Sequence, residues 1–519
     1  MVPDPYVMLP IIISAVSAIV TFTLGSLGER YKVRGIPEVI SFIGLGATFC
    51  SVIFLISRSW FQVITFSYLG FGPPSGALIE ADALSLFMAI IFSGLGLIVS
   101  IYSIGYMKHD TGLPKYYSLL QLLVMGMIGV VFAGDLFTLF VFFEMMAIAT
   151  YVLVSFRKSQ WEPVEAGMKY LFMGAVGSTT VLYAISFLYG ITGTLNIADI
   201  GKAMQGMDLA TKLSTTPLIV FLIVLLVVGF GVKAAIVPSH TWLIDAHPAA
   251  PSGISAMLSG VVIKVAAIAL FRVLFVVFYP IAVGPEVAIL DWRPLIGFIA
   301  IITMIVASIS ALVQSDLKRL LAYSSILNMG YIFIGFAVVS STDSYLGVTA
   351  SLFQILNHAI AKGLLFLCAG AFLHAAKTRD LTELSGIGKK MPLTALAFGI
   401  GAFAIAGVPP LNGFYSKILL LWSAAQFGGF LGYSLLAFGL FSSAIAVYFY
   451  LRIVQVIAFG DPSRKVANVK ETPRSMLIAI WTLAALCIII GVFPKPFFDF
   501  VQQAATALTG IWSYIGAVP

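Results

Sequence analysis

Charged residues are scarce in this chain, since only 10% of its 519 residues are Asp, Glu, Lys or Arg. A soluble protein of this length carries about 25%, so the composition argues against a soluble globular fold. Cysteine is scarce too: Cys50, Cys368 and Cys487 lie far apart, without any CxxC spacing. Such isolated thiols argue against an iron–sulfur cluster or a zinc site. The five histidines are scattered, so we expect no redox cofactor and no metal in this chain.

Long apolar runs dominate the chain instead, and hydrophobic residues make up 60% of it. Each run of 18 or more apolar residues is long enough to cross a bilayer. We predict an all-α polytopic membrane protein with a single membrane domain over residues 1–519. Its fourteen transmembrane helices are expected at 6–25, 36–56, 82–107, 115–133, 135–156, 165–190, 215–248, 251–275, 292–313, 322–340, 347–374, 392–424, 427–458 and 473–493. A tail at 497–516 is predicted to be a short interfacial helix, with a fifteenth span as the alternative.

Basic residues gather in the loops that follow odd-numbered spans. Examples are Arg30, Lys108, Lys158, Lys318 and Lys465. By the positive-inside rule these loops face the cytoplasm. With an even number of spans, both termini are therefore expected on the outer face of the cell (plasma) membrane. The net charge of +7 follows from these loops, so it does not indicate a nucleic-acid partner.

Seven basic residues fall inside predicted spans. Lys169, Arg272 and Arg452 lie near helix ends, where a long side chain can snorkel to the interface, and we interpret them as structural. His358 lies one turn before a deeper lysine, on the same helix face. The deeper lysines are Lys233, Lys264, Lys362 and Lys417.

Glu144 is the one acid that the sequence places among these four lysines. Each charge at the centre of a membrane costs about 2.5–3.5 kcal/mol to insert. Structural ion pairs are one explanation, but four lysines facing one glutamate leave at least three without an acidic partner. A buried lysine without such a partner can take up and release a proton. We therefore favour a proton relay over a set of ion pairs.

Two predicted spans are overlong and interrupted by proline. Pro238 interrupts the seventh span, and Pro409 and Pro410 interrupt the twelfth. Irregular backbone at membrane depth survives only beside protein or a water-filled cavity. Paired interruptions in two halves point to internal repeats. We predict discontinuous helices 7 and 12 and two inverted five-helix repeats, helices 4–8 (114–275) and helices 9–13 (292–458). Two unrelated proline kinks are the alternative.

Three polar residues, His240, Asp245 and His247, crowd the short segment before the eighth span. They could serve as zinc ligands, but the sequence favours another interpretation. Because the charge bias places this segment on the cytoplasmic side, we interpret them as the polar lining of a water path from the cytoplasm.

Six stretches between about Asp82 and Lys417 resemble a known family. They are GDLFTLFVFFEMMAIATYVLVSF, KYLFMGAVGSTTVLYAISFLYGITGTLNI, VKAAIVPSHTWLIDAHPAAPSGISAMLSGVVIKVA, SDLKRLLAYSSILNMGYIFIG, NHAIAKGLLFLCAGAFLH and RDLTELSGIGKKMPLTALAFGIGAFAIAGVPPLNGFYSK. The family is that of the antiporter-like subunits shared by complex I, Mrp-type Na⁺/H⁺ antiporters and archaeal membrane-bound hydrogenase and sulfane reductase complexes.

The resemblance implies a proton-carrying role for six positions on helices 5, 7, 8, 11 and 12, namely Glu144, Lys233, Lys264, His358, Lys362 and Lys417. Some relatives have glutamate at the last position, so lysine there favours the D-type Mrp and hydrogenase-like branch. Asn328 departs from the family pattern because histidine is frequent at that position; a path past it would need water. Phe143 stands where the family has tryptophan before the glutamate, a change that we interpret as one of packing.

We therefore expect a proton-translocating subunit of a larger membrane complex, without a redox centre of its own. Protons would enter near Lys233, pass Lys264 and His358, and leave near Lys417, while Glu144 would hold Lys233 charged. The expected partners are other membrane subunits, a redox arm that carries iron–sulfur clusters and small Mrp-like subunits. The alternatives are the D-type subunit of a stand-alone Mrp antiporter, which would also carry Na⁺, and a non-conducting scaffold subunit.

Overall fold

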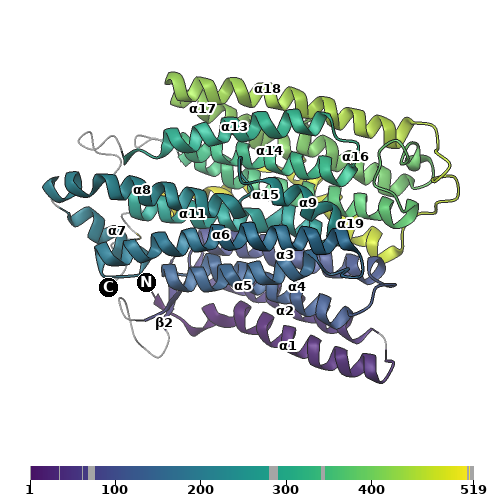
Figure 1. Cartoon of the computed structure of the whole chain (residues 1–519), viewed down its shortest axis with the longest axis horizontal. Coiled ribbons are helices and arrows are strands. Elements are labelled where there is room, and N and C mark those ends of the chain that lie inside the picture. The colour runs from purple at the N-terminus through teal and green to yellow at the C-terminus, as the bar shows by residue number, and fades with distance from the viewer. Residues whose placement is uncertain are drawn as a thin grey trace.

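The structure is a computed structural model that describes residues 2–33, 35–60, 62–67, 76–207, 209–279, 290–339, 345–510 and 514. It is a bundle of long helices that lie side by side, with α1 at one edge and α18 at the opposite edge (Figure 1). Among the described residues, thirteen helices are long and apolar enough to cross a membrane. They are built from α1 (Leu9–Arg30), α2 (Ile36–Ser59), α3 (Ala83–Tyr106), α4 (Leu113–Phe132), α5 (Leu136–Val154), α6 (Trp161–Thr192), α8 (Leu209–Lys233), α10–α11 (Ser252–Phe278 with its π-helical turns), α13 (Arg293–Leu312), α14 (Leu317–Ala337), α15 (Tyr345–Ala376), α18 (Gly429–Val454) and α19 (Arg474–Val492).

Two crossings are broken, as the sequence predicts: the one that begins with α8 and one more, formed by α16 and α17. After α8 ends at Lys233, a non-helical stretch with Pro238 leads to α9 (Thr241–Ala249). Similarly, α16 (Pro392–Ala406) and α17 (Asn412–Phe427) flank a stretch with Pro409 and Pro410. Each break contains a cis peptide bond before proline. With α16 and α17 counted as one crossing, the fold matches the predicted polytopic bundle with discontinuous helices 7 and 12; the inversion of the two repeats stays a prediction.

The helix at Ser252–Phe278 lies at the centre of the bundle. The most apolar stretch of this helix is completely buried, so the helix faces protein on every side. In Gly429–Phe459 only 28% of the corresponding stretch is buried within this chain. The central helix consists of α10 (Ser252–Met257), the π-helical turn η3 (Leu258–Val262), α11 (Ile263–Val273) and the π-helical turn η4 (Leu274–Phe278). Single π-helical turns often mark functional sites, and Lys264 is the second residue after η3, in the first turn of α11.

A small three-stranded sheet, which the sequence did not predict, lies at the end of the bundle that carries the N-terminus (Figure 1). Strand β1 (Val2–Pro3) runs parallel to β2 (Ile64–Ser67), and β2 runs antiparallel to β3 (Leu78–Ala81). Strand β3 leads into α3, where the side chain of Asp82 accepts a hydrogen bond from the Ser85 amide and caps the helix.

Arg272 corrects one prediction from the sequence. Its side chain is buried, not snorkelling, and Nη2 lies 2.5 Å from Glu80 Oε1 and 3.1 Å from Asp82 Oδ2. The Tyr514 hydroxyl also bonds to Glu80. Burial raises the pKa of the Glu80 carboxyl, which lies outside the spans, to about 7. The arginine is therefore part of a buried ion-pair cluster that joins the sheet to the central helix.

The C-terminal helix α20 (Pro494–Thr509) packs against α3 and α15 through buried Val501, Ala504 and Leu508. It is not among the helices apolar enough to cross a membrane. Of the predicted helix at 497–516, residues 511–513 and 515–516 lie outside the described residues. The other short elements are η1 (Pro5–Met8), α7 (Ile197–Gly206), the 3-10 turn η6 (Ile387–Lys389) and the π-helical turn η7 (Gln455–Phe459).

Candidate functional site

Lys264 and His358 meet in the middle of the bundle. Both side chains are fully buried, and Lys264 Nζ lies 2.6 Å from His358 Nδ1. The same ammonium nitrogen donates to the Ser259 carbonyl in the π-helical turn. The Ser259 hydroxyl in turn lies 2.7 Å from the hydroxyl of Ser325 on α14. Two residues that the sequence proposed on separate helices, α11 and α15, are thus brought into direct contact.

Lys362 lies one turn after His358 on α15. Its Nζ donates to the Leu321 carbonyl at 2.9 Å and to the Tyr450 hydroxyl at 3.0 Å. The Tyr450 hydroxyl lies 2.5 Å from the Ser324 hydroxyl. In the part of the chain that the structure describes, no carboxylate pairs with Lys362. The lysine is therefore held by neutral oxygens alone.

A row of buried amides and hydroxyls continues from Ser324 toward the twelfth crossing. Asn328 Nδ2 donates to the Ser324 carbonyl at 2.7 Å, and Gln354 Nε2 donates to Asn328 Oδ1 at 2.8 Å. The Ser416 hydroxyl donates to Gln354 Oε1 at 2.6 Å. Because Ser416 precedes Lys417 in α17, the row connects the surroundings of Lys362 with those of the last lysine. Asn328, where the family often has histidine, is a hydrogen-bonding member of this row.

The side chain of Lys417 reaches back from α17 to the break between α16 and α17. Its Nζ donates to the Ala406 carbonyl at 3.1 Å, and it lies 5.0 Å from the centre of the Tyr331 ring. Ala406 is the last residue of α16, where unpaired carbonyls give the helix end a partial negative charge that favours a cation. Gly407 follows with φ +89°, and a Cβ there would lie 3.0 Å from Lys417 Cδ. The break thus provides both room and charge compensation for the lysine.

Lys233 has a different partner from the one that the sequence suggested. It is buried at the end of α8, and its Nζ contacts the hydroxyl of Tyr151 on α5. The centres of the Phe143, Tyr151 and Tyr170 rings lie 5.6, 4.5 and 5.6 Å from this nitrogen, within the range of cation–π attraction. Among the described residues Glu144 forms no ion pair, and its Oε1 has no hydrogen-bond partner. In this structure the direct contacts of the lysine nitrogen are with an aromatic cage, and the role of Glu144 stays a prediction.

The cage also changes the interpretation of Phe143. The sequence suggested that phenylalanine in place of tryptophan alters packing alone. The ring is instead one of the three that surround the Lys233 ammonium. Indole binds cations more strongly than phenyl does, so this position bears directly on how firmly the lysine is held.

Lys318 is a fifth buried lysine, and the sequence missed it. Because α14 begins at Leu317 rather than near residue 322, Lys318 belongs to the first turn of the helix and not to a loop. Its Nζ donates to the Ala250 carbonyl at 2.8 Å and contacts the Ser255 hydroxyl at 3.4 Å. It therefore ties α14 to the start of the central helix.

The three polar residues before the eighth span do not come together. Asp245 pairs with the exposed Lys169 at 2.9 Å and with Arg319 at 3.4 Å. His247 is buried against the Phe366 ring, with a centroid distance of 4.4 Å, and neither of its ring nitrogens has a hydrogen-bond partner among the described residues. His240 lies in the break, with Nδ1 3.2 Å from the Pro238 carbonyl. In the described ranges, no group of three or more His, Cys, Asp or Glu could hold a metal ion; the water path remains a prediction.

Sequence reasoning also missed Tyr151 and Tyr450. Tyr151 lies seven residues after Glu144, which is two helical turns on the same face, so this spacing could have revealed it. Tyr450 is 88 residues from Lys362, and no local pattern connects the two.

Known proteins share this architecture. A family model described as "NADH:quinone oxidoreductase/Mrp antiporter, TM" matches residues 133–446, which is more than half of the chain. The chain belongs to this family. A second model, described as "NADH-Ubiquinone oxidoreductase (complex I), chain 5 N-terminus", matches residues 77–117. The family that the sequence motifs indicated is thereby confirmed, and the chain is an antiporter-like membrane subunit.

Individual relatives extend over most of this antiporter-like subunit. F(420)H(2) dehydrogenase subunit N of Methanosarcina mazei is 34% identical over 439 residues, covering 83% of this chain and 85% of that protein. NADH-quinone oxidoreductase subunit N of Desulforudis audaxviator is 32% identical over 451 residues, covering 84% and 86%. Among solved structures, a chain of the membrane-bound sulfane sulfur reductase, an archaeal respiratory membrane complex, superposes with a TM-score of 0.87 at 28% identity and covers 99% of both chains. These relatives are subunits of multisubunit membrane complexes.

Proposed function

We propose that this antiporter-like subunit moves protons across the membrane along its buried lysines, as one part of a larger complex. The observation that carries the proposal is the contact of Lys264 with His358 and, one turn further along α15, the row that runs from Lys362 and Tyr450 to Ser416 beside Lys417. In this row the lysines are held by neutral oxygens and one imidazole. Each can release its proton without leaving an unpaired buried carboxylate behind.

The individual contacts suit proton transfer to different degrees. Lys264 and His358 can pass a proton directly, because each nitrogen can act as donor or acceptor. His358 Nε2 has no partner among the described residues, so the second nitrogen is free to pass the proton onward. The hydroxyls of Tyr450 and Ser324 can exchange protons. Asn328 and Gln354 do not titrate, so they orient the row while water carries the proton past them.

The proposed direction follows from the charge bias of the loops. The basic loops would face the cytoplasm and both termini the outside of the plasma membrane. Protons would enter near Lys233 and the α8–α9 break and leave near Lys417 and the α16–α17 break. When Lys233 turns from Tyr151 toward Glu144, the carboxylate would hold it charged; release from Glu144 would send its proton toward Lys264.

A reaction in another chain would supply the energy. The relatives are named as dehydrogenase, quinone oxidoreductase and sulfur reductase subunits, so we propose a redox arm with iron–sulfur clusters as a partner. Other membrane subunits, including small Mrp-like ones, would complete the complex. Mass spectrometry of the subunits that co-purify with the chain would test this composition.

The decisive experiment is Lys264→Ala in the assembled complex. Proton translocation into vesicles, measured per turnover of the redox reaction, should be lost while the complex still assembles. The exposed, surface-paired Lys169 provides the matched control, since Lys169→Ala should translocate normally. If Lys264→Ala translocates as well as the unchanged complex, the chain is a scaffold subunit and the proposal fails.

A second candidate is the D-type subunit of an Mrp Na⁺/H⁺ antiporter. The description of the family model, which includes Mrp antiporters, and lysine at position 417 favour it. The two candidates differ in what drives transport. Proton movement driven by a sodium gradient without any redox substrate would establish the antiporter; movement that requires redox turnover would establish the respiratory complex.

A further inference from the structure

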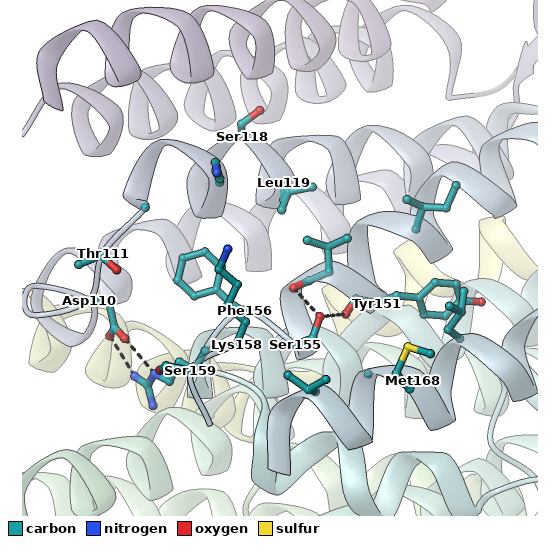
Figure 2. Close-up of a pocket in the computed structure, with 18 of the residues that line it drawn as sticks. Asp110, Thr111, Ser118, Leu119, Tyr151, Ser155, Phe156, Lys158, Ser159 and Met168 are labelled. Atoms are coloured by element: carbon teal, nitrogen blue, oxygen red, sulfur yellow. Dashed lines mark hydrogen bonds and ion pairs between the residues drawn. The ribbon is translucent and has the colours of Figure 1, made fainter. Parts of the chain in front are cut away.

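A groove runs along the side of the bundle between α1, α4, α5 and α6, with a volume of about 1020 Å³. Figure 2 shows Asp110, Thr111 and Lys158 toward one end of its lining and Tyr151 and Met168 toward the other. The first end belongs to the loops that follow α3 and α5. These loops carry the basic residues that the positive-inside rule assigns to the cytoplasm. The groove therefore leads from the predicted cytoplasmic surface to Tyr151.

The cytoplasmic end of the groove is polar and firmly built. Arg157 Nε and Nη2 donate to the two carboxylate oxygens of Asp110 at 2.9 and 3.0 Å. Lys115 and Lys158 also line this end. Deeper in the groove, the Ser155 hydroxyl donates to the Tyr151 carbonyl at 3.0 Å (Figure 2). These polar groups can hold water at the entrance, whereas the lining farther in is largely apolar and includes Ile148, Val152 and Leu171.

Tyr151 separates the groove from Lys233. It lines the groove, and its hydroxyl contacts Lys233 Nζ. The Tyr151 ring packs perpendicular to the ring of Tyr170, with 4.6 Å between the ring centroids. Tyr170 in turn stacks on Trp242, with 3.8 Å between their centroids. Trp242 Nε1 donates to the carbonyl of Val232 at 2.7 Å. Because Val232 precedes Lys233, one aromatic stack fixes both the tyrosine ring and the backbone of the lysine.

Gly174 of α6 leaves the space that this contact needs. A Cβ at this position would lie 1.9 Å from the Tyr151 hydroxyl oxygen and 3.0 Å from Lys233 Nζ. Any larger residue would have to displace the tyrosine, the lysine or both. The hydroxyl–ammonium contact therefore depends on α6 as well as on α5 and α8.

We infer that Tyr151 is the proton gate between the cytoplasmic groove and Lys233. This inference rests on the proposed proton translocation. In the step, a hydronium ion in the groove gives a proton to the Tyr151 oxygen, while the tyrosine gives its own proton to the neutral Lys233 amine. The products are water, an unchanged tyrosine and an ammonium group, which the cage of Phe143, Tyr151 and Tyr170 stabilises.

Glu144 completes the gate. It lies two turns before Tyr151 on the same face of α5, and its Oε1 is buried and has no hydrogen-bond partner within the part of the chain that the structure describes. Once charged, Lys233 has the carboxylate as a second anchor. A lysine on Glu144 no longer touches Tyr151, so the proton cannot return to the groove by the route through which it came.

The test is Tyr151→Phe in the complete complex, which keeps the ring and its cation–π contact but removes the hydroxyl. Proton translocation should fall by at least about tenfold, because a positioned proton-transfer group is lost, and assembly should be unchanged. Gly174→Ala should produce the same loss by displacing the contact. Tyr183→Phe is the matched control, because Tyr183 lies on α6 but is exposed.

A second measurement tests the route itself. Ser155→Cys, in a Cys50→Ala background that removes the exposed thiol, places a thiol in the groove. A membrane-impermeant thiol reagent added on the cytoplasmic side should label it and block translocation.

Translocation at the unchanged rate in Tyr151→Phe, with Lys233→Ala inactive, would overturn the gate and leave the proton relay standing. Normal translocation in both Lys233→Ala and Lys264→Ala would overturn the relay as well.

Discussion

Lys264 Nζ and His358 Nδ1 lie 2.6 Å apart although 94 residues separate them in the chain. At this distance one nitrogen must donate and the other accept, so two cations cannot share the contact. The pair therefore holds one proton between its two facing nitrogens. Lys264 could act at the centre of the bundle by exchanging this proton or by its positive charge alone, and a substitution can distinguish these two roles.

Lys264→Arg distinguishes proton exchange from charge, because the guanidinium keeps the positive charge but does not release its proton. Translocation should fall by about 10²-fold or more. The rate of proton translocation in vesicles that contain the assembled complex measures this. Lys169→Arg, at an exposed ion pair, is the control. An active Lys264→Arg complex would mean that the lysine acts by its charge alone.

Lys417→Glu should retain more translocation than Lys417→Ala. A glutamic acid can still titrate, and in its neutral form its hydroxyl can donate to the Ala406 carbonyl that now accepts from the lysine. Alanine offers neither. Parallel translocation assays on the two variants decide the question, and equal losses would contradict a titrating role at this position.

Asn328→Leu should break the row that joins Lys362 to Lys417. Leucine removes the hydrogen bonds to the Ser324 carbonyl and from Gln354, which leaves a buried amide unpaired. The expected loss of stability is about 1–3 kcal/mol, visible as a lower unfolding temperature in detergent, together with slower translocation. Asn328→His keeps polar atoms in the row and should do less damage; equal effects would show that the row is not used.

Glu80 predicts a pH dependence of stability. Burial raises its pKa from 4.5 to about 7, so the folded state binds more protons than the unfolded state between these values. The contribution of Glu80 to stability should therefore be fully present below about pH 4.5 and be lost, by roughly 3 kcal/mol, as the pH rises through 7. Glu80→Gln, which mimics the protonated acid, should flatten this dependence in unfolding temperatures measured from about pH 5 to about pH 8. The exposed Glu29→Gln control should leave the slope unchanged.

The sequence was sufficient to predict the spans, the two breaks and the four deep lysines. These features depend on local properties: the length of apolar runs, the missing amide of proline and the cost of a charge in the membrane. The buried state of Lys318 was missed because it depends on where α14 begins, and helix ends are the least certain part of a sequence-based prediction.

Contacts between distant residues were beyond sequence reasoning. Arg272 pairs with Glu80, which lies 192 residues away in the chain, and no spacing rule predicts that ion pair. The contact of Lys233 with Tyr151 was missed for a related reason. Charge complementarity favoured Glu144, whereas the packing of α5, α6 and α8 around Gly174 brings the Tyr151 hydroxyl to the ammonium.

The contact between Glu80 and Tyr514 spans 434 residues, and Arg272 lies between them in the chain. During synthesis on the ribosome, Glu80 and Asp82 therefore emerge long before either partner exists. Two acids without a counter-charge are most stable in water, so the start of α3 can settle into its final position only after α11 has been inserted. The cluster closes only when residue 514 has been made. Insertion of the first helices is thus provisional, and a late step in translation completes the fold of an early segment.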